Sequence, residues 1–81
     1  MDHNYLETAH GKNELRLLRI GDVIDLTKLS KSYVYALALE GRFPRSVPLV
    51  PGGTARAWIY SEVQAWIGQR IADRDQERGN E

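Results

Sequence analysis

Chain-breaking residues divide the middle of this sequence into short segments, and their spacing limits the length of each element there. Gly21 interrupts an apolar run, Gly41 and Pro44 close a helical segment, and Pro51-Gly52 separates two β-forming stretches. Proline fixes φ and lacks an N–H, while glycine adopts backbone conformations that other residues avoid. The chain therefore predicts short helices and strands joined by tight turns.

The length of 81 residues allows one domain with a modest core. Residues 1–14 are polar and lack apolar periodicity, so we expect a flexible leader before a domain at 15–75 and a charged tail at 76–81. His3 and His10 lie in the leader, where solvated side chains explain them more simply than metal ligands. Cysteine is absent, which excludes disulfides and thiolate zinc sites. We expect neither a metal nor a cofactor.

A pair of short helices is predicted on either side of residues 28–30. Asp22 places a negative charge at the start of the first helix, and Ser30 is the expected N-cap of the second. Gly41 suits the left-handed conformation at the end of the second helix. The predicted apolar faces comprise Val23, Ile24 and Leu26 in the first helix, and Val34, Leu37 and Ala38 in the second.

Residues 46–60 predict a β-hairpin whose turn is supplied by residues 51–54. Pro48 confines the first strand to an edge of the sheet, since proline cannot donate to a ladder. The apolar run at residues 15–20 is too brief for a helix and favours a short strand that pairs elsewhere. The predicted hairpin strands contain Val47, Leu49 and Val50 on one side, and Ala57, Trp58, Ile59 and Tyr60 on the other.

The last helix is expected to begin at Ser61 and to run to about Asp75. Ser61 and Gln64 have the spacing of a capping box. The tryptophans at 58 and 66 are interpreted as core residues rather than ligand-stacking ones. The apolar stripe of this helix comprises Val63, Trp66, Ile67 and Ile71.

The predicted order is strand, helix, tight turn, helix, hairpin, helix: a mainly α fold with a small β-hairpin, of the winged helix-turn-helix class. In that motif the second helix, here residues 31–40, enters the major groove of DNA. The hairpin at 46–60 would then be a wing on the minor groove or the backbone.

Charge distribution supports a polyanionic partner, although the whole chain has a net charge of zero. Residues 28–58 contain five basic residues and one acidic residue, Glu40, which gives this stretch a net charge of +4. The charge of a surface patch, rather than the total, governs binding to a polyanion. Double-stranded DNA is therefore the expected partner.

The candidate DNA-binding residues lie in the second helix, beside it and in the hairpin. Ser30, Lys31 and Ser32 lie in the first helical turn, where free N–H groups suit a phosphate. The hydroxyls of Tyr33 and Tyr35 can bind phosphates, and their ring edges can contact thymine methyl groups. Arg56, which the hairpin carries, can reach the minor groove. Arg42 and Arg45 follow the helix and can clamp the flanking DNA backbone. The remaining candidate is Lys28.

No catalytic motif competes with this interpretation, so we expect neither an enzyme nor a small-molecule substrate. The chain has no P-loop, no Gly-rich strand-to-helix turn and no H-E-x-x-H. No apolar run approaches the roughly 20 residues of a membrane span, and no signal peptide opens the chain. We expect no membrane partner and a bacterial or phage-encoded protein of the cytoplasm, associated with the nucleoid.

Four motifs in this order resemble the AlpA family of phage and genomic-island regulators, which are related to excisionases and to MerR-type DNA-binding domains. The resemblance covers residues 15–72. It is carried by Leu17-Leu18-Arg19-Ile20, by Leu29-Ser30-Lys31-Ser32-Tyr33-Val34-Tyr35, by Glu40-Gly41-Arg42-Phe43-Pro44, and by Trp58 with Ser61-Glu62-Val63-Gln64-Ala65-Trp66-Ile67.

This resemblance implies a transcriptional regulator or an excisionase (a recombination directionality factor) of a prophage or genomic island, with integrase and cooperatively bound copies as partners. Two positions depart from the family pattern. Lys28 stands where the family usually has glycine, and Ala36 stands where it often has an arginine that would contact DNA. Ala36 therefore joins the candidate residues as a position that alters site preference.

A protein-interaction module is the alternative hypothesis. Tyr33, Tyr35, Leu39 and Phe43 would then form an apolar docking face for integrase, a polymerase subunit or an antirepressor target.

Overall fold

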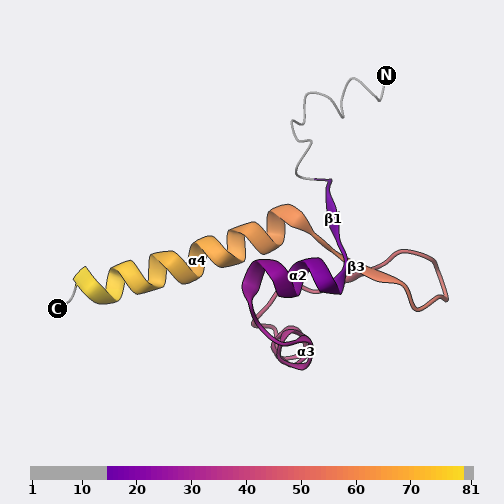
Figure 1. The fold of residues 1–81 in the computed structure, drawn as a ribbon, viewed down its shortest axis with the longest axis horizontal. Helices are drawn as coiled ribbons and strands as arrows, with labels where there is room; N and C mark the ends of the chain where they lie inside the picture. Colours follow the sequence, from indigo (N-terminus) through magenta and orange to yellow (C-terminus); the bar gives the residue numbers. More distant parts are fainter. Residues whose placement is uncertain (1–14, 80–81) are drawn as a thin grey trace, which may run out of the picture.

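Within residues 15–79, which the computed structural model describes, the chain forms three helices and three short strands (Figure 1). The described fold is mainly helical with a small antiparallel sheet, as the sequence predicts. The leader at 1–14, with His3 and His10, lies outside the described residues. In chain order the elements are β1 (Leu17–Leu18), α2 (Ile20–Thr27), α3 (Lys31–Leu39), β2 (Val47–Pro48), β3 (Arg56–Ile59) and α4 (Tyr60–Gly79).

The central strand of the sheet is β3, which pairs with β1 on one side and with β2 on the other. Leu18 lies opposite Trp58 in the first pair, and Pro48 lies opposite Arg56 in the second. Both pairs are antiparallel. The prediction of a short N-terminal strand that pairs elsewhere is confirmed, and so is the edge position of Pro48.

A tight turn at residues 50–53 closes the hairpin, which projects from the centre of the molecule (Figure 1). Gly53 N–H donates to the Val50 carbonyl at 2.9 Å, and Gly52 has a φ of 78°. Proline before a glycine with positive φ is the arrangement of a type II turn. The strands are shorter than predicted, because β2 ends at Pro48 and Tyr60 already belongs to α4.

The first helix begins earlier than the glycine at its start suggests. α2 starts at Ile20 and includes Gly21, so the prediction that Gly21 breaks the chain there is wrong. The Asp22 carboxylate accepts the N–H of Arg19 at 3.0 Å, which satisfies a free donor at the first turn. The carboxylate also lies at the helix end that favours negative charge.

The second helix follows the prediction closely. Ser30 Oγ accepts the N–H of Tyr33 at 3.2 Å, which confirms the N-cap. Val34 and Leu37 are buried, and Gly41 has the left-handed conformation just beyond the last turn, with a φ of 78°.

One core is assembled from every helix, from β1 and β3, and from the loop after α3. Trp58 is its largest fully buried side chain, and its Nε1–H donates to the Pro44 carbonyl at 3.0 Å. Phe43 is only 4% exposed and packs edge-on against Trp66, with ring centroids 4.8 Å apart. The core interpretation is confirmed for Trp58, whereas Trp66 is partly buried and packs against the core from outside. The buried cluster consists of Leu18, Val23, Val34, Leu37, Phe43, Trp58 and Val63.

Helix α4 starts immediately after β3 and continues past the core (Figure 1). Because it begins at Tyr60, Ser61 lies inside the first turn, so the predicted N-cap is wrong. The helix also extends beyond the expected end near Asp75 to Gly79. Val63 is buried, but Ile71 is 47% exposed, so only the first half of the predicted apolar stripe reaches the core. None of the helices at 15–79 combines the length and apolar character of a membrane span.

Candidate nucleic-acid interface

The turn between α2 and α3 is built around Lys28, which has a φ of 65° and a ψ of 17°. Lys28 N–H donates to the Ile24 carbonyl at 2.7 Å, and Leu29 N–H donates to Thr27 Oγ1 at 3.2 Å. These hydrogen bonds hold Lys28 in the left-handed conformation, so that only three residues separate α2 from α3. The turn therefore tolerates a side chain at this position, and it leaves the Lys28 side chain exposed.

The first turn of α3 presents polar groups to solvent. Ser30, Lys31 and Ser32 are exposed, and the two serine hydroxyls lie 3.5 Å apart. Ser30 Oγ satisfies the N–H of Tyr33, while the earlier N–H groups of the helix have no helical acceptor. This end of α3 has the polarity that suits an anion.

One face of α3 is turned away from the core and exposed to solvent. Ser32, Tyr35, Ala36 and Leu39 recur at i, i+3, i+4 and i+7, and all four are exposed. Leu39 is 89% exposed, the largest value among the exposed apolar side chains of residues 15–77. The two charged residues of the segment 31–40, Lys31 and Glu40, stand at its ends. The centre of the outward face consequently carries no charged side chain.

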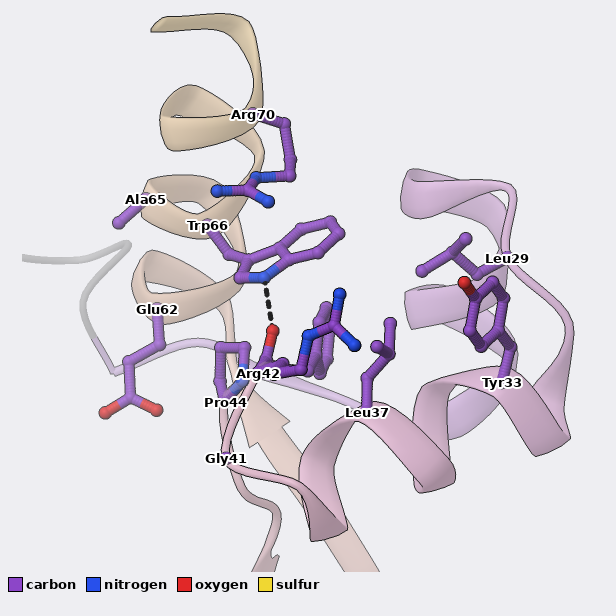
Figure 2. Close-up of a pocket in the computed structure, with 11 residues that line it drawn as sticks. Leu29, Tyr33, Leu37, Gly41, Arg42, Pro44, Glu62, Ala65, Trp66 and Arg70 are labelled. Atoms are coloured by element: carbon purple, nitrogen blue, oxygen red, sulfur yellow. Dashed lines mark hydrogen bonds between the residues drawn. The ribbon is translucent and has the colours of Figure 1, made fainter. Parts of the chain in front are cut away.

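The two tyrosines of α3 lie on opposite flanks of the helix rather than side by side. Tyr35 faces the hairpin, and its ring centroid is 5.8 Å from that of Trp58. Tyr33 faces α4 and lines a groove with Trp66 (Figure 2). Phe43 is buried beneath this groove, so its predicted place on an exposed docking face is wrong.

A hollow of about 430 Å³ separates the outward face of α3 from the root of the hairpin. Tyr35 and Leu39 line it from the helix, and Arg45 and Arg56 line it from the other side. The guanidinium of Arg56 is held in place by Ser46. Its Nε–H donates to Ser46 Oγ at 2.6 Å, and an Nη2–H donates to the Ser46 carbonyl at 3.1 Å.

Two of the five guanidinium N–H groups of Arg56 are used in this way, and three remain for a ligand. The guanidinium of Arg56 is thus held at the root of the hairpin. The hairpin tip, at residues 50–54, carries no charged residue. The cationic groups of this region are therefore concentrated beside α3.

A second groove, of about 810 Å³, runs between α3 and α4 (Figure 2). Trp66 and Tyr33 lie on its two facing sides, and Trp66 Nε1–H donates to the Arg42 carbonyl at 2.8 Å. The Arg70 guanidinium lies 5.4 Å from the centre of the Trp66 ring, a cation–π contact. Glu62 is on the rim, and its carboxylate points away from the groove in Figure 2.

Across residues 15–79, no three acidic or histidine side chains come together as a metal site would require. Likewise no described side-chain N or O atom is buried without a hydrogen-bond partner. The ten predicted residues are all exposed and surround α3, from the turn before it to the hairpin beside it. Such a surface can hold a polyanion around one helix.

Comparison with known proteins places the whole of this surface inside one family. Residues 16–71 match the family described as Prophage CP4-57 regulatory protein (AlpA). The chain belongs to the AlpA family. It is also 48% identical over 59 residues to the uncharacterized protein ORF88 of Enterobacteria phage P4. That match covers 73% of this chain and 65% of the phage protein. No solved structure matches the chain significantly.

The AlpA match ends at Ile71, close to the point where α4 leaves the core. It therefore includes β1, both short helices, the hairpin and the packed half of α4. AlpA membership makes the chain a member of a regulatory family of phage origin.

Sequence reasoning overlooked Arg70 as a member of the candidate site. Its position four residues after Trp66 was the available signal, because residues at i and i+4 share a helix face. The importance of Ser46 also went unnoticed. Its partner Arg56 is ten residues away, and only the register of the hairpin brings the two together.

Proposed function

We propose that this AlpA-family protein is a sequence-specific DNA-binding regulator of a prophage or genomic island, with α3 as the recognition helix of a winged helix-turn-helix. The observation that carries the proposal is the exposed, uncharged face of α3, which is bordered by cationic side chains. An α-helix fits the major groove of B-DNA, and phosphates border that groove on both sides. The bordering cations are Lys28, Lys31, Arg42, Arg45 and Arg56.

In this arrangement α3 lies in the major groove and its two flanks meet the two phosphate backbones. Lys28 and Lys31 serve one backbone from the start of the helix. Arg45 and Arg56 contact the other phosphate backbone from the root of the hairpin, which acts as the wing. Hydrogen bonds to phosphates fix the register of the protein, whereas contacts to base edges supply specificity.

The fixed guanidinium of Arg56 supports a phosphate contact at the wing. Ser46 holds it beside the hollow, so little side-chain entropy is lost on binding. Arg42 and Arg70 lie on the α4 side, along the second groove, where they pair with Glu40 and Asp73. Tyr33 in this groove offers its hydroxyl to the backbone on the side of α3 away from the hairpin.

A protein-docking module is less well supported by the geometry. Of the four residues predicted for its apolar face, Phe43 is buried. Tyr33 and Tyr35 point to different flanks, so the face lacks a continuous aromatic surface. The remaining exposed apolar residue, Leu39, is next to two arginines.

Salt-dependent DNA retention tests the proposal. If about five cations each neutralise a phosphate, log affinity should fall with log salt at a slope of about −4 to −5. The double variant Lys31→Ala/Arg56→Ala should reduce that slope by about 2 units, because two phosphate contacts are lost. Arg74→Ala is the matched control, since Arg74 is on the outer half of α4 and pairs with Asp75.

A slope that is flat for the wild type would refute DNA binding through these residues. If DNA retention is unaffected in the double variant but a protein partner is lost, the docking module is the better explanation. Footprinting on the DNA of the host element distinguishes the finer roles. Protection at a promoter indicates a transcriptional regulator, and protection of repeats beside an attachment site indicates an excisionase.

One domain of this size has limited contact area with DNA, since single modules bury on the order of 600–1,000 Å². We therefore propose that several copies bind cooperatively, with integrase as a partner in the excision role. We further propose that the protein acts in the cytoplasm, in association with the nucleoid. A binding isotherm on DNA with one site, compared with DNA with adjacent sites, tests the cooperativity.

A further inference from the structure

The outward face of α3 has an unusual chemical composition for a helix that reads DNA. Its four exposed members, Ser32, Tyr35, Ala36 and Leu39, offer two hydroxyls and two apolar groups. None of them is an arginine, lysine, asparagine, glutamine or carboxylate. The face consequently lacks the side chains that form bidentate hydrogen bonds with a base.

The chemistry of base recognition then restricts what this face can distinguish. Arginine and lysine read guanine, asparagine and glutamine read adenine, and carboxylates accept from cytosine. Thymine differs from these because its 5-methyl group is recognised by apolar contact. Glu40, the only carboxylate of segment 31–40, is at the helix end and accepts a hydrogen bond from Arg42 at 3.2 Å.

Leu39 is the apolar group best placed for such a contact. It is 89% exposed on α3 and lines the hollow that Arg45 and Arg56 share. An apolar protein surface would have to desolvate these two guanidinium groups to reach it. A DNA backbone would pair with them instead, and it would bring base edges to the leucine.

We propose that Leu39, with Ala36 one turn before it, reads thymine by packing against 5-methyl groups in the major groove. The inference rests on the proposed DNA-binding function and names the specificity of the same surface. The preferred sites are then rich in A·T pairs at the positions below the C-terminal half of α3. Ala36, whose side chain is a single methyl group, becomes part of the same apolar surface.

The test uses the full chain and the duplex that it retains most strongly from a randomised library. This duplex is synthesised in two forms, one with thymine and one with deoxyuridine, which lacks only the 5-methyl group. Wild-type affinity should fall by about fourfold for each methyl group in contact, which corresponds to about 0.8 kcal/mol. Fluorescence anisotropy at constant salt measures both affinities.

Two variants separate the role of Leu39 from a general loss of binding. Leu39→Ala should weaken binding to the thymine duplex and should lose most of the difference between the two duplexes. Leu17→Ala is the matched control, because Leu17 is 48% exposed on β1, the strand farthest from β2 in the sheet. The control variant should distinguish thymine from deoxyuridine as the wild type does.

Equal wild-type affinity for the two duplexes would overturn the thymine assignment while leaving DNA binding intact. A full thymine preference in Leu39→Ala would also overturn it. Failure of the chain to retain any duplex from the library would overturn the proposed function itself.

Discussion

The backbone strain at Lys28 leads to a prediction that depends on the fold alone. Lys28 is the one residue other than glycine with a positive φ at 15–79, and it lies in the turn between α2 and α3. We expect Lys28→Gly to stabilise the protein. Glycine has no Cβ, so it adopts the left-handed conformation without the steric cost that other residues incur.

The expected gain is the difference between two opposing effects. The left-handed conformation costs an L-residue about 1–2 kcal/mol. Glycine increases the entropy of the unfolded chain, which lowers stability by about 0.4–1 kcal/mol. The hydrogen bond from the N–H of residue 28 to Ile24 is unaffected by the substitution, since it involves only the backbone. The net increase in the free energy of unfolding is therefore about 0.5–1 kcal/mol.

Thermal unfolding followed by circular dichroism measures this difference. For a domain of this size, the expected gain raises Tm by about 2–8 °C. Lys28→Ala is the control, because it removes the same charge but retains a Cβ. Its free energy of unfolding should stay within about 0.5 kcal/mol of the wild type.

Comparing the free energies of unfolding of the two variants tests whether the Cβ of residue 28 causes the strain. If Lys28→Gly is no more stable than Lys28→Ala, the Cβ at this turn does not cause strain, and the reasoning fails. Both variants should show the same loss of salt dependence in DNA binding, because both lack the lysine charge.

Two further substitutions test contacts described above. Trp66→Phe retains the packing on Phe43 but loses the donor to the Arg42 carbonyl. The free energy of unfolding, measured by thermal or urea unfolding, should therefore fall by about 1 kcal/mol. An unchanged stability would show that this hydrogen bond contributes nothing. Ser46→Ala should weaken DNA retention by about fivefold with little change in Tm, because Arg56 loses one of its two fixing hydrogen bonds. In an Arg56→Ala background the same serine substitution should have no further effect on DNA retention, and an additive loss would contradict the proposed role of Ser46.

The features that sequence predicts well here are those governed by local chemistry. Ser30 caps α3 and Gly41 ends it, because a serine hydroxyl and a residue without Cβ act on adjacent backbone groups. The turn at residues 50–53 also follows from its own Pro-Gly pair. All these interactions lie within a few residues along the chain.

The sequence-based predictions fail where contacts between distant segments of the chain determine the local structure. Ser61 has the spacing of a cap, yet α4 begins at Tyr60, whose N–H donates to the Arg16 carbonyl at 2.8 Å. Tyr33 and Tyr35 are close in sequence but face different partners, because α4 and the hairpin lie on opposite sides of α3. No local pattern indicates which partner each tyrosine meets.

The absence of a linker between β3 and α4 gives this small protein a mechanical property. β3 ends at Ile59 and α4 begins at Tyr60, and the Arg16 guanidinium lies 4.5 Å from the centre of the Tyr60 ring. The junction is thus braced, and no flexible residue separates the sheet from the helix. A helix of 20 residues is about 30 Å long, so a rotation of about 10° at the hairpin displaces its far end by about 5 Å. A small change of angle at this junction therefore gives a larger displacement at the far end of α4.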